Sequence, residues 1–282
     1  MIHKKIHLNR YYPLKNDPIL EMTRPSMLDC PDKDQPLLKA VIVVPGGSYM
    51  FCSIRESDPV VSQFLADDYC CFTLWYTTNT PYPVPQLEAM AAVDYIKRHA
   101  KALRVDTTRL VMAGFSAGGH LTASYGMLER DEKLHSMLNI EGRDTTVTAL
   151  VLSYPVITMG EETHQDTMET ITGKDESLRE LLSVEKHVSK DYPPTFLWTT
   201  KEDGAVPYTN TVMMDEALTK AHVKHECVIY PHLWHGLSVA RRIINLPSYD
   251  DYVKDFKEVA TWVNKAKKFL NKVMKVKYRG NV

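Results

Sequence analysis

The sequence predicts an α/β fold in which helices cover both faces of a mostly parallel central sheet. The first observation is a set of short, continuous apolar runs, the pattern of strands buried on both faces of a parallel sheet. The second is that helical patterns separate these runs, as crossover helices do between parallel strands. The predicted strands span residues 40–44, 70–75, 110–113, 149–154, 195–198 and 227–230.

The predicted helices lie between these strands or after the last of them. One of them, 85–102, starts with a proline, which the first turn of a helix tolerates, and then places Leu87, Met90, Ala91 and Tyr95 at helical spacing. The other predicted helices span 59–67, 117–129, 208–221 and 249–270. Apolar Ile2, Ile6 and Leu8 at the N-terminus predict one or two further edge strands.

The longest departure from this alternation is 156–194, a polar segment with one short predicted helix near 176–182. Because it connects two sheet strands, it is expected over their carboxyl ends, where open α/β sheets bind ligands. We interpret it as a partial cap or pocket wall rather than a second domain. A surface excursion away from the site is the alternative. With no internal repeat or linker, 1–282 is predicted to form a single domain.

Composition and charge indicate a soluble globular protein. Of the 282 residues, 44% are hydrophobic and 24% charged, and 34 Lys and Arg stand against 35 Asp and Glu. This balance excludes the overall basic field that gathers nucleic acid. Basic residues from Lys265 to Arg279 could contact an acidic partner or a membrane, or form the solvated face of a last helix. No apolar stretch approaches the roughly 18 residues that span a bilayer.

The five cysteines predict reduced thiols. Their number is odd, and Cys30, Cys52, Cys70, Cys71 and Cys227 include no C-x-x-C pair. A disulfide framework is therefore not expected, and the N-terminus lacks the apolar core of a signal peptide. Both observations favour the cytoplasm.

Residues 114–118 read G-x-S-x-G and stand directly between a predicted strand and a predicted helix. This is the context of a nucleophile elbow, a sharp turn that exposes a serine oxygen above the sheet. Small neighbours let the backbone come close, and the N-terminus of the next helix supplies positive potential. We therefore predict Ser116 as the nucleophile.

Serine needs a base, and with such an elbow the chain order is serine, acid, histidine. His232 and His235 follow the last predicted strand, and Gly236 gives the imidazole of His235 room to turn toward the serine. We predict His235 as the base. His120 lies in the helix that begins at the elbow, so we expect it to pack there instead.

The acid is expected on the loop after the preceding strand, where Glu202 and Asp203 are both available. Asp203 stands beside Gly204 in a tight loop that favours a short side chain. We predict that Asp203 orients His235 and that Glu202 is a solvated surface acid.

A backbone oxyanion hole should stabilise the charge that develops on a substrate carbonyl. Ala117 follows the nucleophile, and the P-G-G-S-Y turn at 45–49 follows an early strand. Glycines there allow a turn that points amides into the site. The predicted donors are the N–H groups of Gly47, Ser48 and Ala117. Tyr49 and Phe115 are predicted to touch substrate.

These motifs resemble the bacterial esterase/lipase branch of the α/β-hydrolase superfamily related to hormone-sensitive lipase. The similarity is greatest to small acetyl-esterase and acetylxylan-esterase-like carboxylesterases. It extends from about 41 to 240 and includes PGGSY, the RESDP run at 55–59, GFSAGGHL, YPPTFLW at 192–198, the D-x-x-VP pattern at 203–207 and HGLSVA. Pro45 and Ser48 replace the histidine and last glycine usual in the oxyanion motif. The chain also lacks the long N-terminal cap of many relatives, which implies an open site.

The resemblance implies an α/β-hydrolase fold and a serine carboxylesterase that cleaves small, short-acyl, acetyl-like esters without a metal or organic cofactor. A small-molecule ester is the expected partner, with neither nucleic acid nor membrane. Two alternatives remain, an amidase or peptidase on the same fold and a non-catalytic binding protein. The sequence leaves the natural ester, the oligomeric state and the role of the basic tail open.

Overall fold

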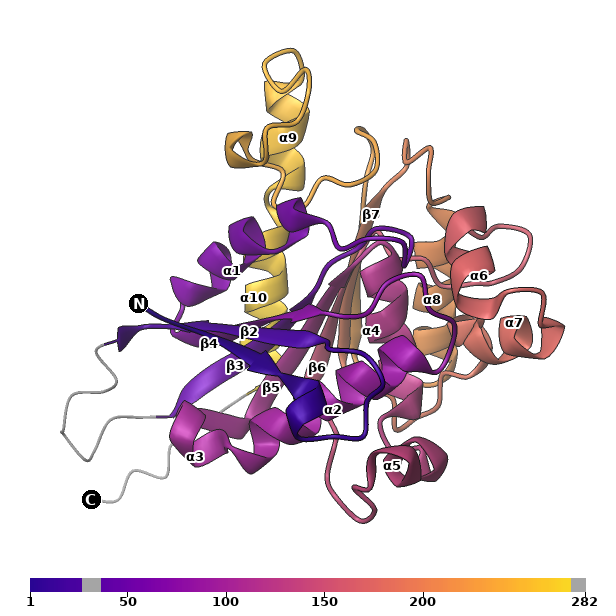
Figure 1. The fold of residues 1–282 in the computed structure, drawn as a ribbon. Coiled ribbons are helices and arrows are strands. Elements are labelled where there is room, and N and C mark those ends of the chain that lie inside the picture. The colour runs from indigo at the N-terminus through magenta and orange to yellow at the C-terminus, as the bar shows by residue number, and fades with distance from the viewer. Residues whose placement is uncertain (27–36, 275–282) are drawn as a thin grey trace.

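An eight-stranded sheet with helices on both faces forms the centre of the protein (Figure 1). The computed structural model describes residues 1–26 and 37–274. The strand order is β1-β2-β4-β3-β5-β6-β7-β8, with β1 and β2 antiparallel to their neighbours and β3 to β8 parallel to one another. The strands are β1 (Ile2–His7), β2 (Ile19–Arg24), β3 (Leu38–Val44), β4 (Tyr69–Trp75), β5 (Val105–Phe115), β6 (Ala149–Ser153), β7 (Thr195–Thr200) and β8 (His225–Tyr230).

All six predicted strands are confirmed, so the sheet is mostly parallel as expected. The additional N-terminal edge strands are two, β1 and β2, although Leu8 itself falls in the short helix η1 (Leu8–Arg10). At the start of strand β2, Leu20 and Met22 are buried whereas Ile19 and Glu21 are only partly buried, and this alternation fits a strand that pairs antiparallel with β4.

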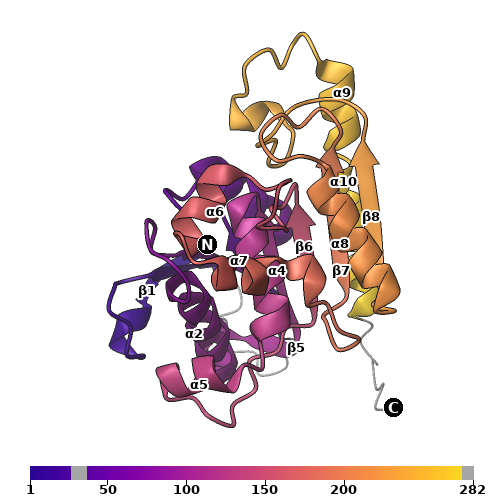
Figure 2. The ribbon, with the colours of Figure 1, turned by 90° about the vertical axis from the view of Figure 1, so that its right-hand side faces the viewer.

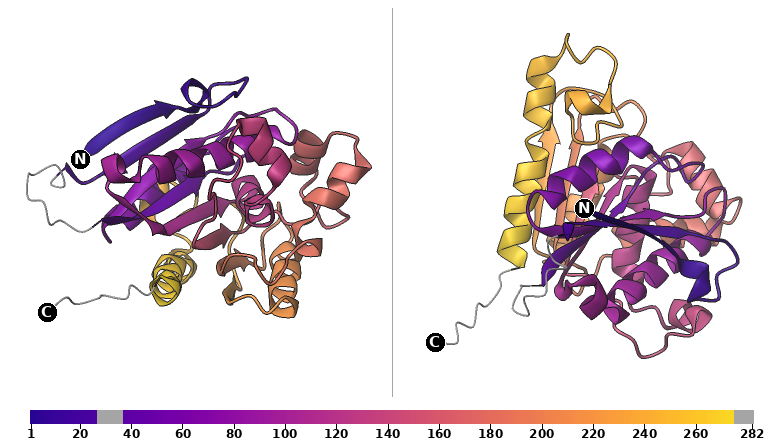
Figure 3. Two further views of the ribbon diagram at one scale, coloured as in Figure 1. Left: turned by 90° about the horizontal axis from the view of Figure 1, so that it is seen from below. Right: turned by 60° about the vertical axis from the view of Figure 1, so that its left-hand side comes forward.

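Two helical layers cover the sheet (Figures 1 and 3). On one face, α1 (Asp58–Leu65), α9 (Val253–Val259) and α10 (Trp262–Val273) pack against Val41 and Val43 of β3 and their neighbours. On the other, α2 (Val84–Arg98), α4 (Ala117–Leu128) and α8 (Thr209–Lys220) pack with Ala40 and Ile42. Successive β3 side chains thus enter opposite cores, because side chains alternate along a strand. The remaining helices are η3 (Ile54–Glu56), α3 (Ala100–Leu103), α5 (Glu132–Leu138), α6 (Gln165–Thr172), α7 (Glu176–Leu182), η4 (Val184–Lys186) and η5 (Arg242–Ile244).

Two predicted helices are each divided. The helix expected at 249–270 consists of α9 and α10, and the one expected at 85–102 consists of α2 and α3. Between α9 and α10, the Thr261 hydroxyl donates to the Glu258 carbonyl oxygen over 2.6 Å. Such a local bond from a threonine competes with regular helix geometry.

The segment 156–194 connects β6 to β7 and contains α6, α7 and η4. Side chains cap both α-helices, because His164 accepts from the Thr167 N–H and Asp175 accepts from the N–H groups of Ser177 and Leu178. Figure 2 shows α6 at the end of the molecule toward which β6, β7 and β8 point. This segment therefore reaches the carboxyl edge of the sheet.

The basic residues near the C-terminus lie partly on α10. Lys267 pairs with Asp67 over 2.8 Å, and Lys272 with Glu226 over 2.6 Å. Lys265 lies over the ring of Tyr230. The later residues of the basic run, 275–279, lie outside the described residues. On α10, these lysines thus contact other parts of the same chain.

The four cysteines among the described residues, Cys52, Cys70, Cys71 and Cys227, are free thiols. Cys30 lies outside the described residues. Within 1–26 and 37–274, we find no helix with both the length and the apolar character needed to cross a membrane.

Candidate active site

The serine at the elbow has a strained backbone. Ser116 stands between β5 and α4 with φ +53° and ψ −121°. The turn is so tight that a Cβ on Gly118 would lie 2.2 Å from the Val44 carbonyl oxygen, and one on Gly114 would lie 2.2 Å from the Gly118 carbonyl oxygen. Glycine at both positions therefore lets the turn close, and the strain at Ser116 is of the kind that concentrates at functional sites.

Three side chains from separate loops form a hydrogen-bonded row. The Ser116 Oγ lies 2.8 Å from the His235 Nε2, and the His235 Nδ1 lies 2.6 Å from the Asp203 Oδ2. The Asp203 side chain is fully buried, whereas 21% of the His235 side chain is exposed. The row thus runs from the interior to a surface that a small molecule can reach.

Local hydrogen bonds hold the Asp203 carboxylate in this orientation. Its Oδ1 accepts from the N–H groups of Ala205 and Val206 over 3.0 and 2.9 Å, which leaves Oδ2 for His235. His235 stands on a loop after β8, where Gly236 has φ +78°. This left-handed conformation, easy for glycine, lets the chain turn directly after the imidazole.

The alternative acid and base pair with each other away from the serine. Glu202 lies 3.0 Å from the Nδ1 of His232, and both side chains are more than half exposed. His120 is fully buried between the Tyr49 hydroxyl and the Leu182 carbonyl oxygen. Burial lowers the pKa of His120 to about 4, so this histidine is neutral, as expected for a packed side chain.

The turn after β3 lies beside the elbow, because a Cβ on Gly46 would lie 2.8 Å from the Ser116 Cβ. Gly47 has φ +124° and Ser48 has φ +56°, and a Cβ on Gly47 would lie 2.2 Å from the Phe51 carbonyl oxygen. The turn closes through hydrogen bonds from the Met50 and Phe51 N–H groups to the Gly47 carbonyl oxygen. In the part of the chain that the structure describes, the N–H groups of Gly47, Ser48 and Ala117 donate to no protein acceptor.

Tyr49 and Phe115, the predicted substrate contacts, both have completely buried side chains. The Tyr49 hydroxyl lies 2.8 Å from the His120 Nδ1, and the Phe115 ring packs edge-on against Trp262. Tyr49 has a positive φ, and Phe115 belongs to the apolar core beneath the elbow. Both side chains pack inside the protein in this arrangement, and their contact with substrate stays a prediction.

Three further residues at this site, Glu56, Tyr154 and His164, were not predicted from the sequence to take part in it. Glu56 and Tyr154 are buried and hydrogen-bonded to each other over 2.7 Å, and the Tyr154 ring packs edge-on against the His235 ring. His164, at the start of α6, is close enough for the charges of Asp203 and His235 to act on it, although burial is the main cause that lowers its pKa. Only the RESDP run contained a signal for one of them, Glu56.

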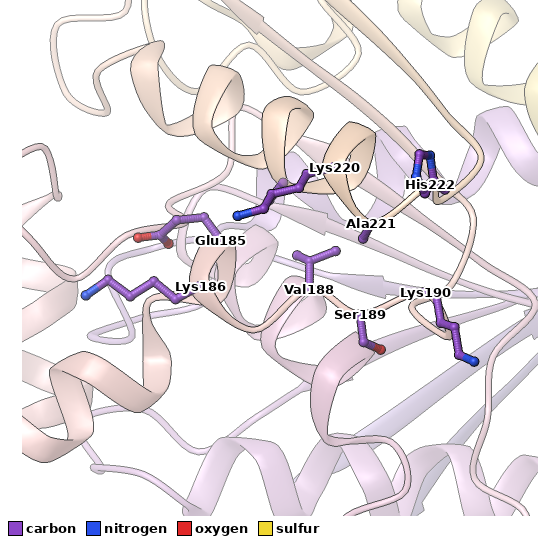
Figure 4. A pocket seen from close by; sticks show the side chains of 9 residues that line it. Glu185, Lys186, Val188, Ser189, Lys190, Lys220, Ala221 and His222 are labelled. Atoms are coloured by element: carbon purple, nitrogen blue, oxygen red, sulfur yellow. The ribbon is translucent and has the colours of Figure 1, made fainter.

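A surface hollow of about 410 Å³ lies elsewhere, between the end of α8 and the segment after η4. Figure 4 shows Lys186, Lys190 and Lys220 around it, and none of the serine, histidine and aspartate of the row lines it. Among residues 1–26 and 37–274, no group of three or more His, Cys, Asp and Glu side chains is arranged to hold a metal ion.

Comparison with known proteins gives a family match and close structural similarity. The BD-FAE family matches residues 28–218. The chain is 35% identical over 209 residues to endo-1,4-beta-xylanase B of Butyrivibrio fibrisolvens, a match that covers 71% of this chain and 32% of that protein. The chain thus spans about a third of the length of this curated relative.

Among solved structures, an acetyl ester-xyloside bifunctional hydrolase from Caldicellulosiruptor lactoaceticus superposes with a TM-score of 0.80 at 30% identity, over 96% of both chains. MGS-M1, an alpha/beta hydrolase enzyme from a Medee basin deep-sea metagenome library, gives 0.73 at 25% identity, over 98% of this chain and 99% of that chain. The chain therefore has the α/β-hydrolase fold.

Proposed function

Because the chain belongs to the BD-FAE family and has the α/β-hydrolase fold, we propose that it is a serine carboxylesterase that hydrolyses small, acetyl-like esters. The observation that carries this proposal is the row from the Ser116 Oγ through His235 to the buried Asp203 carboxylate. A strained serine with a base in direct hydrogen bond and an acid behind that base is the arrangement of nucleophilic acyl transfer.

In the proposed reaction, His235 takes the Ser116 proton while the serine oxygen attacks the ester carbonyl. The tetrahedral intermediate collapses, the alcohol leaves with the proton from His235, and an acyl-serine remains. A water molecule then attacks the acyl group, His235 accepts its proton and returns it to Ser116, and the carboxylic acid leaves. Asp203 holds the tautomer of His235 and stabilises the imidazolium formed in each half.

The N–H groups of Gly47, Ser48 and Ala117 are the proposed oxyanion hole. Their lack of a protein acceptor supports this role, because an amide kept free near a reacting carbonyl can donate to the oxygen as charge develops. The left-handed backbone conformations of Gly47 and Ser48 keep the N–H groups of these two residues out of the hydrogen bonds that close the turn. The proposed mechanism uses no metal or organic cofactor.

We further propose that the chain acts as one α/β-hydrolase unit in which 156–194 forms a partial cap. The electrostatic proximity of His164 to Asp203 and His235 supports this, because it brings the start of α6 to the site. A cytoplasmic location remains a prediction from the cysteines and the N-terminal sequence.

Acetylated sugars are the substrate class that we favour. The names of two relatives, a xylanase and an acetyl ester-xyloside bifunctional hydrolase, refer to xylan chemistry, and each describes that relative alone. Initial rates on acetylated xylose or xylo-oligosaccharides, compared with acetates of simple alcohols, test the preference. Equal rates on the acetylated sugars and on the simple acetates would show that the enzyme recognises the acyl group and not the sugar.

The first test of the activity is hydrolysis of p-nitrophenyl acetate by the wild type and by Ser116→Ala. We expect turnover and labelling by a fluorophosphonate probe in the wild type, and loss of both in the variant, because the nucleophile is gone. An acyl-peptide substrate in parallel distinguishes an amidase or peptidase from an esterase. Labelling that persists at another serine contradicts the assignment, and a wild type without turnover or labelling points to a non-catalytic protein.

A further inference from the structure

A buried carboxylate, Glu56, stands behind the active site between two of its loops. Only 4% of Glu56 is exposed. Its Oε2 accepts a hydrogen bond from the Gly46 N–H over 2.7 Å, and its Oε1 accepts one from the Tyr154 hydroxyl over 2.7 Å. Glu56 therefore joins the turn after β3 to the residue that follows β6.

Both oxygens of the Glu56 carboxyl group lie within hydrogen-bond distance of a donor. The Ser238 N–H donates to the Tyr154 hydroxyl oxygen over 2.9 Å, so the Tyr154 proton is free to point toward Glu56. The Gly46 N–H can only donate. Both carboxylate oxygens can thus act as acceptors, an arrangement that stabilises the charged form of Glu56. Burial raises the pKa of Glu56, while the two hydrogen bonds and the charges of His235 and Arg55 act in the opposite direction.

On one side, Glu56 holds the turn that carries the proposed oxyanion donors. Gly46 directly precedes Gly47 and Ser48, and the surrounding protein atoms leave no room for a side chain at this position. A Cβ on Gly46 would lie 2.8 Å from the Ser116 Cβ and 2.9 Å from the Glu56 Oε2. The hydrogen bond to the Gly46 N–H therefore fixes backbone that touches the nucleophile itself, and a shift there would move the adjacent amides.

On the other side, Glu56 acts on the histidine through Tyr154. The Tyr154 ring packs edge-on against the His235 ring, with centroids 4.9 Å apart. The loop after His235 is tied to the same place, since the Ser238 N–H bonds to Tyr154 and the Ser238 hydroxyl donates to the Arg55 carbonyl oxygen over 2.5 Å. The ring and its loop thus share one buried anchor.

We propose that Glu56 is a positioning residue that fixes the turn with the proposed oxyanion donors relative to the His235 ring. Its negative charge also stabilises the imidazolium that forms during acyl transfer. This inference rests on the proposed esterase function, and it adds a second buried acid to the one that bonds directly to His235. Arg55, Cys52 and Tyr76 also lie close enough for charge interaction with this carboxylate.

The decisive variant is Glu56→Gln, because glutamine keeps the size of the side chain but offers only one acceptor oxygen. If its amide NH2 faces the Gly46 N–H, that hydrogen bond is lost, and if it faces the Tyr154 hydroxyl, the direction of that hydrogen bond is reversed. We expect kcat to fall about 10- to 100-fold with KM within about threefold, since the affected groups act on the transition state. The acid limb of the kcat/KM profile should move to lower pH, because the charge that favours the imidazolium is gone.

Glu129→Gln is the matched control. Glu129 is also buried and also accepts a backbone hydrogen bond, from the Val147 N–H over 3.0 Å, but it lies beyond the far end of α4, before β6. Its replacement should leave kcat and the pH profile unchanged even where it lowers the melting temperature. All rates are divided by the concentration of active serines, counted with a fluorophosphonate, so that unfolded protein does not enter the comparison.

Tyr154→Phe provides a second route if Glu56→Gln does not fold. It keeps the ring against His235 and the Glu56 charge but removes the hydroxyl between them, and we expect kcat to fall about 3- to 10-fold with little movement of the acid limb. A folded Glu56→Gln with wild-type kcat and an unmoved limb overturns the proposal, as does wild-type kcat in Tyr154→Phe when only that variant folds. Failure of the esterase function itself would appear separately, as absent turnover in the wild type.

Discussion

At the residue scale, Asp203 divides its two oxygens between backbone and imidazole. Two N–H groups hold Oδ1, and Oδ2 faces the His235 Nδ1. Because a carboxylate can only accept, this contact places the proton on Nδ1 and leaves Nε2 free to accept from Ser116. Glu202, one residue earlier, faces His232 instead.

This difference predicts opposite outcomes for two neighbouring substitutions. Asp203→Asn should lower kcat about 10³- to 10⁴-fold, because an amide can donate to Nδ1 and thereby favour the wrong tautomer. Glu202→Gln should lower kcat less than about tenfold, because it changes only an exposed pair with His232. Steady-state kinetics on p-nitrophenyl acetate measures both. If the two effects were reversed, Glu202 would be the orienting acid.

How far single residues can be predicted depends on where their evidence lies. Ser116 and His235 follow predicted strands within recognisable local patterns, and the structure brings the two side chains together as the sequence predicts. The burial of the Tyr49 side chain depends on its packing in the folded chain, which no neighbouring residue reveals. Glu56 and Tyr154 are 98 residues apart, so only the folded chain shows that they meet.

At the scale of the elements, the six predicted strands are confirmed because a strand buried on both faces is a continuous apolar run. The ends of the helices are predicted less accurately than the strands, because the helical spacing of apolar residues continues across a break such as the one at Thr261. Short helices such as α5 and α6 carry too few turns to give a clear helical repeat. The segment 156–194 contains only short helices, α6, α7 and η4.

These short elements predict a preference for short acyl chains, acetyl to butyryl. A deep apolar tunnel requires more protein than α6, α7 and η4 supply. Each methylene that finds an apolar wall gains about 0.8 kcal/mol, or roughly fourfold in kcat/KM. We therefore expect kcat/KM for p-nitrophenyl esters to peak by C4 and to decline at C8 and C12. A maximum at C8 or beyond would indicate a tunnel and a lipase-like enzyme.

At the scale of the whole molecule, the apolar cores on the two faces of the sheet enclose several carboxylates. Burial raises the pKa of Glu88 and of Glu129 to about 7, although hydrogen bonds from Thr77 and from the Val147 N–H act in the opposite direction. The pKa of an unfolded glutamate is about 4.3. Between these values the folded protein holds a proton that the unfolded chain lacks. Each group therefore favours folding more strongly as the pH falls from about 7 toward about 4.3.

Glu129→Gln should remove one of these contributions. Relative to the wild type, the variant should be most impaired at pH 5 and least impaired, or even stabilised, at pH 8. The difference in the free energy of unfolding should change by about 1–3 kcal/mol across this range. Urea unfolding of both proteins at pH 5, 6, 7 and 8 measures it. A constant difference at every pH would show that Glu129 does not change its protonation on folding.

The loops of the active site join parts of the chain that are far apart in sequence. Ser116 meets His235 across 119 residues, and Arg55 meets Ser238 across 183. Contacts of this range require the whole sheet order to be in place, because closing long loops is costly until the intervening elements have packed. In a refolding experiment, the return of ester hydrolysis is therefore a stricter sign of completion than the return of the circular dichroism of the helices. A nascent chain that stops before β8 would contain the proposed nucleophile and acid, and we expect it to be inactive because the proposed base, His235, has not yet been synthesised.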